Sequence, residues 1–69
     1  MMLVTIMPGP GDQFRVRELA PNTRRVNTVM WTGCYETAVD FVRANYNEQE
    51  VLAPCDFKAA VLARRREGK

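Results

Sequence analysis

The feature that most constrains the fold is an apolar stripe at helical spacing in the middle of the chain. Five residues recur at i, i+3, i+4, i+7 and i+11, namely Tyr35, Ala38, Val39, Val42 and Tyr46. This spacing places them on one face of an α-helix, with polar residues on the opposite face. Thr32 is the expected N-cap, and Asn45 or Asn47 is expected to end the helix in left-handed geometry. A lone helix of this kind needs a sheet beneath its stripe.

Three segments before the helix are predicted to be strands. Residues 2–7 form a short run rich in β-branched side chains, which ends in the turn sequence of residues 8–12. Residues 13–19 alternate between apolar and basic side chains, as a half-buried strand does. Residues 20–23 contain proline and asparagine at positions that are typical of a turn. Residues 24–31 form the third predicted strand.

The segment after the helix is open to two interpretations. Residues 57–63 are rich in helix formers, and Asp56 is a suitable cap for a helix. The same residues alternate, with apolar side chains at every second position from Phe57, and we favour a strand that completes the sheet. The predicted fold is one α+β domain over residues 1–69, with a small antiparallel sheet of three to four strands and one helix on one face, in the order β-β-β-α-β. Residues 64–69 are expected to be a frayed basic tail.

Composition excludes several classes of function. The chain has 69 residues, of which 46% are hydrophobic, and it contains no histidine and two cysteines. We therefore expect no catalytic residues, no metal site, no cofactor and no enzymatic activity. Cys34 and Cys55 are expected to be reduced thiols, with a disulfide between them as the alternative. The apolar N-terminal run stops at Pro8 without a basic lead, so we expect no signal peptide, no membrane span and a cytoplasmic location.

Both faces of the predicted sheet carry apolar side chains, and one helix can cover only one of them. The first strand offers Val4 and Ile6 on one face and Leu3 and Met7 on the other. The uncovered face must then be a partner surface, a dimer interface or a patch hidden by the loop at residues 8–12.

Basic residues are concentrated in two segments. Residues 13–25 contain four arginines and one glutamate, residues 57–69 contain five basic residues and one glutamate, and residues 36–56 contain five acidic residues and one arginine. Arginine is favoured where carboxylate or phosphate groups are bound and at protein interfaces. The candidate partner-binding residues are Arg15, Arg17, Arg24, Arg25, Arg64, Arg65 and Arg66. A merely solubilising surface is the alternative, and a nucleic-acid site is secondary because few aromatic residues are interleaved with the arginines.

Residues 24–66 resemble the T7-type phage inhibitors of bacterial RNA polymerase. The matching pieces are Val29-Met30-Trp31, the segment from Thr32 to Val39 that opens the helix, and Pro54 followed by Phe57-Lys58. The resemblance implies a compact sheet with one packed helix, and arginines on a last strand that bind the target. Arg64 and Arg65 are the nearest candidates for those arginines.

The expected function is therefore that of a non-enzymatic, phage-like inhibitor. It would bind and block a bacterial protein or protein–nucleic-acid complex, such as RNA polymerase or a defence nuclease, through arginines and an exposed apolar sheet face. A small basic nucleic-acid-binding module and a self-associating subunit, including a homodimer, are the alternatives.

Overall fold

A three-stranded antiparallel sheet forms the centre of the protein within residues 2–67, the part of the chain that the computed structural model describes. Its strands are β1 (Leu3–Pro8), β2 (Phe14–Leu19) and β3 (Val26–Thr32), in the spatial order β1-β2-β3. The three predicted strands are confirmed, with bounds shifted by one or two residues. Gly11 lies in the turn between β1 and β2, and Asn22 lies in the turn between β2 and β3. Their φ angles of 68° and 67° are in the left-handed region, which glycine and asparagine tolerate.

The register of the strands defines two faces of the sheet. Ile6 and Met30 lie on either side of Val16, and this row belongs to the first face. Leu3 and Val26 lie on either side of Leu19, and this row belongs to the second face. The register shifts between Val16 and Arg17, where β3 contains one extra residue, Val29, in a β-bulge.

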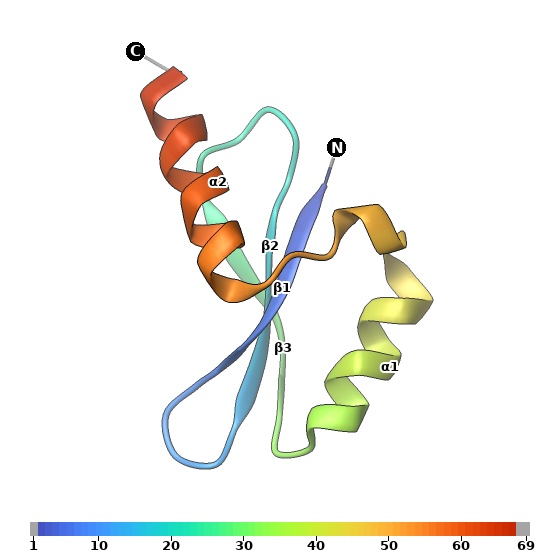
Figure 1. The fold of residues 1–69 in the computed structure, drawn as a ribbon. Helices are drawn as coiled ribbons and strands as arrows, with labels where there is room; N and C mark the ends of the chain where they lie inside the picture. Colours follow the sequence, from blue (N-terminus) through green and yellow to red (C-terminus); the bar gives the residue numbers. More distant parts are fainter. Residues whose placement is uncertain (1, 68–69) are drawn as a thin grey trace.

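One helix packs on each face of the sheet. Helix α1 (Tyr35–Asn45) is followed by one 3-10 turn, η1 (Glu48–Glu50), and by helix α2 (Pro54–Glu67). Figure 1 shows the sheet between α1 and α2, so the described chain has three layers. Helix α1 buries Ala38 and Val42 of the predicted stripe against Val4 and Val16 on the first face.

The predicted fold class is confirmed, but the prediction for residues 57–63 was wrong. These residues lie in helix α2, so the order of the larger elements is β-β-β-α-α and a fourth strand is absent from the described residues. Pro54 occupies the first helical position, where its missing N–H costs nothing, and Asp56 lies in the first turn. Phe57 and Val61 are four residues apart and both face Leu19 on the second face of the sheet. Residues 64–67 continue the helix instead of fraying, and residues 68–69 of the predicted tail lie outside the described residues.

The chain passes from one face of the sheet to the other around the outer edge of β1. Val51 forms an isolated parallel bridge with Val4, and the Leu52 N–H donates to the Val4 carbonyl over 2.9 Å. The fully buried Thr5 hydroxyl donates to the Leu52 carbonyl over 2.8 Å. These bonds fix the start of α2 against β1.

Two details of α1 differ from the sequence prediction. The N-cap is Cys34 and not Thr32, whose hydroxyl instead accepts a hydrogen bond from the Cys34 N–H. The helix ends at Asn45 as expected, but the next residue, Tyr46, has extended geometry instead of a left-handed one. Tyr35, the first residue of the predicted apolar stripe, is 54% exposed and therefore lies outside the buried core.

Candidate functional site

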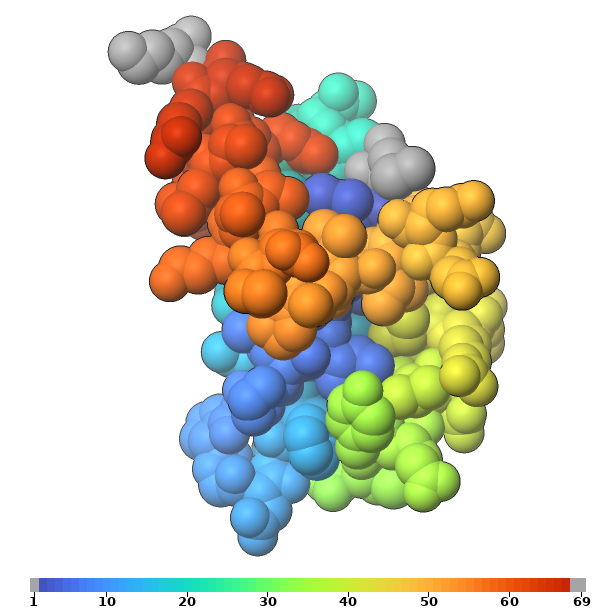
Figure 2. Space-filling view, viewed as in Figure 1, coloured from blue at the N-terminus to red at the C-terminus, as the bar shows by residue number. Residues whose placement is uncertain are grey.

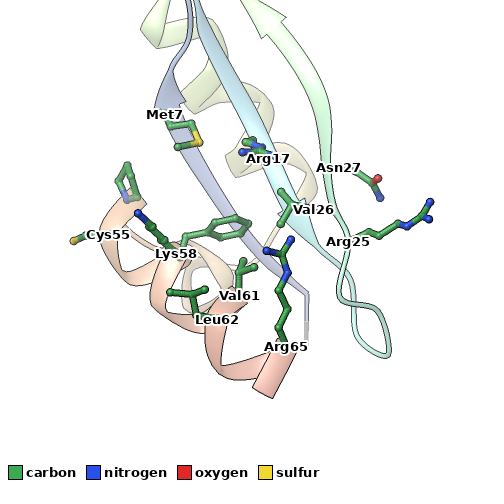
Figure 3. Close-up of a pocket in the computed structure, with 12 residues that line it drawn as sticks. Met7, Arg17, Arg25, Val26, Asn27, Cys55, Lys58, Val61, Leu62 and Arg65 are labelled. Atoms are coloured by element: carbon green, nitrogen blue, oxygen red, sulfur yellow. The ribbon is translucent and has the colours of Figure 1, made fainter. Parts of the chain in front are cut away.

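An open groove lies between α2 and the second face of the sheet. Helix α2 packs most closely on β1, which leaves part of β2 and β3 uncovered. The groove has a volume of about 800 Å³, and its apolar residues are Met7, Val26, Pro54, Cys55, Phe57, Val61 and Leu62. Figure 3 shows Met7 and Val26 on the strands and Val61 and Leu62 on the helix across the groove. The second apolar face that the sequence implied is thus only partly covered.

Four cationic side chains surround this groove, and we call the space together with them the basic groove. Arg17 comes from β2, Arg25 precedes β3, and Lys58 and Arg65 come from α2. None of the described residues that line the groove is acidic. In Figure 3 the Arg65 side chain extends from α2 toward Val26, whereas Arg25 projects away from the helix at the outer rim. The Arg65 Nε also donates weakly, over 3.4 Å, to the Arg24 carbonyl.

The helical repeat of α2 and the pleat of β2 explain why these residues meet. Leu62 follows Lys58 by four positions, and Arg65 follows Leu62 by three. This spacing places all three side chains on one side of α2. On β2, Arg15 and Arg17 alternate with the apolar residues that face α1, so both point to the second face. Arg17 thereby reaches the floor of the basic groove.

A second basic and aromatic feature continues the same face beyond the groove. Met7 and Trp31 lie opposite Arg15 in one row across the sheet. Trp31 is 50% exposed, and the Arg15 guanidinium carbon lies 5.8 Å from its ring centroid, which is a cation–π contact. Gly9 lies so close to this ring that a Cβ at position 9 would be 2.9 Å from its Cζ3 atom. We call Met7, Arg15 and Trp31 the shelf.

Two arginine nitrogens on this face are enclosed without a hydrogen-bond acceptor. The Nε atoms of Arg15 and Arg17 are both buried, and no described residue accepts a hydrogen bond from either. A guanidinium N–H that is shielded from water without an acceptor raises the free energy of the free protein. An acidic or phosphate group bound at the floor of the groove would relieve this cost at Arg17, which lines the groove.

The structure separates the remaining predicted arginines from the basic groove. The Arg64 Nη1 donates to the carbonyls of Ala20 and Thr23 over 2.9 and 3.0 Å, and so ties α2 to the turn between β2 and β3. Figure 2 shows the end of α2 packed beside this turn. Arg24 and Arg66 are exposed and do not line the groove. Arg64 therefore makes a structural contact that the sequence did not reveal.

Sequence reasoning identified Arg65 but missed other residues in the helical half of the site. Lys58 and Leu62 were not among the predicted binding residues, because residues 57–63 were read as a strand. The spacing of Lys58, Leu62 and Arg65 was the signal that could have found them, since it places all three on one helical side.

Both cysteines are free and exposed, so the disulfide alternative is wrong. Hydrogen bonds from the Thr37 side chain and from the amides of Thr37 and Glu36, at the start of α1, lower the pKa of the Cys34 thiol. Among residues 2–67, no three His, Cys, Asp or Glu side chains are grouped so that they could hold a metal ion.

Comparison of the whole chain with protein-family models, with curated proteins and with solved structures finds no match. No helix in the described part of the chain has the length and apolar character needed to cross a membrane. The basic groove and the shelf are therefore the basis for assigning a function.

Proposed function

We propose that this protein is a non-enzymatic binding protein that docks on another protein through the basic groove. The observation that carries the proposal is the set of four cations that line a largely apolar groove, without an acidic residue in the described lining. Interfaces between proteins combine apolar anchors with arginine, and a few such residues supply most of the binding free energy. A partner segment with apolar side chains and acidic flanks would match this surface.

The proposed class of partner is a bacterial macromolecular machine in the cytoplasm, such as RNA polymerase or a defence nuclease, which the protein would block as phage inhibitors do. The resemblance to polymerase inhibitors in the sequence motivates this choice. That resemblance places the binding arginines on a last strand, and here Arg65 lies on α2. The proposal therefore rests on the basic groove and not on that strand.

Nucleic-acid binding is the second candidate function, and the shelf favours it. The half-exposed Trp31 ring is a surface on which a base could stack, and Arg15 and Arg17 beside it could contact phosphate groups. Such binding would weaken steeply with salt, because counterions are released from the nucleic acid.

Capture from a bacterial lysate with a matched pair of variants tests the proposal. Arg65→Glu reverses a charge that lines the groove, and Arg66→Glu makes the same change on the neighbouring residue outside the lining. We expect the same proteins to be retained by the parent and by Arg66→Glu after nuclease treatment, and to be lost with Arg65→Glu.

Two other outcomes would contradict the proposal. Retention that disappears on nuclease treatment would favour nucleic-acid binding. A protein that captures nothing but sediments as a concentration-dependent oligomer would be a self-associating subunit.

A further inference from the structure

The partner segment that enters the basic groove can be specified more closely from its shape and charge. This step rests on the proposed function and adds to it the conformation and chemistry of the bound segment. We infer that the occupant is an acidic amphipathic α-helix of the partner protein, which lies alongside α2 on the uncovered part of the sheet.

The space beside α2 has the dimensions of a helix. The α2 residues that line the groove run from Pro54 to Arg65, eleven residues further along. At a rise of about 1.5 Å per residue this side of α2 is about 16 Å long, which corresponds to about three helical turns. Since adjacent strands lie about 4.8 Å apart, β2 and β3 together provide a floor about as wide as one helix.

The floor of the groove is suited to the apolar stripe of such a helix. Leu62, which lines the groove from α2, is 43% exposed, and Trp31, on the second face of the sheet, is 50% exposed. Val26 and Met7, which also line the groove, are partly buried. An apolar stripe that covers these side chains would complete the helical layer on the second face, as α1 does on the first face.

The charges around the floor require acidic flanks on that helix. Lys58 and Arg65 stand on the α2 side, Arg25 stands at the outer rim, and Arg17 lies at the floor. Glutamates placed on both sides of the apolar stripe would face these cations, whereas lysines there would be repelled. One such carboxylate would also provide an acceptor for the enclosed Arg17 Nε.

The two cysteines provide a direct footprint of the site. Cys55 lines the basic groove, and Cys34 lies at the start of α1 outside its lining; both thiols are exposed and free. A helix bound in the groove should slow alkylation of Cys55 and leave the alkylation of Cys34 unchanged. Trp31 is the single tryptophan of the chain, so its emission reports whether the bound helix reaches the shelf.

The experiment uses the full chain and three probes. The first probe is a designed peptide with leucines at helical spacing flanked by glutamates, the second has the same composition shuffled into strict alternation, and the third is a single-stranded oligothymidylate. We expect the helical peptide to bind, to protect Cys55 and to shift the Trp31 emission. Arg65→Glu should weaken this binding by at least about tenfold, and Arg66→Glu by less than about twofold.

Each contrary result has a separate meaning. If the alternating peptide protects Cys55 as well as or better than the helical one, the inference of a helix is overturned and the proposed function stands. If neither peptide protects Cys55, the inference is overturned whatever the lysate capture gives. If only the oligothymidylate protects Cys55 and its binding is lost with Arg65→Glu, both the inference and the proposed function are overturned.

Discussion

The bond between Arg64 and the turn before β3 leads to a specific prediction about stability. The Arg64 Nη1 donates to the carbonyls of Ala20 and Thr23, forty or more residues earlier in the chain, and the side chain is partly buried. The substitution Arg64→Met removes both hydrogen bonds but keeps most of the apolar stem, so it separates the loss of the bonds from the loss of packing.

The expected loss of stability is a large part of the total. A hydrogen bond from a charged group contributes about 1.5–3 kcal/mol, but here both bonds share one nitrogen and water can reach the turn after the substitution. We therefore expect a loss of about 2 kcal/mol, against about 5 kcal/mol for a domain of this size. For so short a chain this corresponds to a fall in Tm of about 8–16 °C.

The assay is thermal unfolding followed by circular dichroism, with Arg66→Met as the control. Arg66 is an exposed arginine in the same turn of α2, so its substitution should change stability by less than about 0.5 kcal/mol. If Arg64→Met and Arg66→Met melt at the same temperature as the parent, Arg64 does not fix α2 to the turn.

Three further predictions concern α1 and its ends. Val42→Asp should unfold the protein, because Val42 is 3% exposed and an unpaired buried carboxylate costs several kcal/mol; a native circular dichroism spectrum would contradict this. Burial and the hydrogen bond to Glu18 raise the pKa of Tyr46, so this group stabilises the fold below its unfolded pKa of about 10 and the contribution is lost as the pH rises further. Urea unfolding between neutral and strongly alkaline pH should therefore show a steeper decline for the parent than for Tyr46→Phe. The lowered pKa of Cys34 should make this thiol react with iodoacetamide at neutral pH, and Thr37→Val should slow the reaction, as measured by mass spectrometry of the labelled peptides.

Most of the first face of the sheet could be predicted from the sequence. The spacing of Ala38 and Val42 identified the buried side of α1, and the turn residues marked the ends of the strands. The bulge at Val29 could not be predicted, because it depends on the pairing of β3 with β2. The hydrogen bond from Arg64 to the Ala20 carbonyl could not be predicted either, because it depends on where α2 packs against a turn that is distant in the sequence.

The error over residues 57–63 has a physical explanation. Phe57 and Val61 are four positions apart, so they share a face in a helix and also in a strand. Ala59 and Ala63 complete the strand pattern, but alanine buries too little surface to decide between the two conformations. The remaining information was the high helix propensity of lysine, alanine and leucine in this segment, and the helix that this propensity predicts is the structure observed.

The existence of the basic groove follows from the two arginines on the central strand. Arg15 and Arg17 occupy the second face of β2, where a helix centred over the sheet would enclose both guanidinium groups. Enclosing such charges without partners costs several kcal/mol each, which is comparable with the whole stability of a domain of this size. Helix α2 instead packs on β1 and buries Phe57 and Val61 beside Leu19, at the end of the sheet that lacks these arginines. The same two residues that keep α2 from covering the face therefore leave the groove open, and Arg17 gives its floor a positive charge.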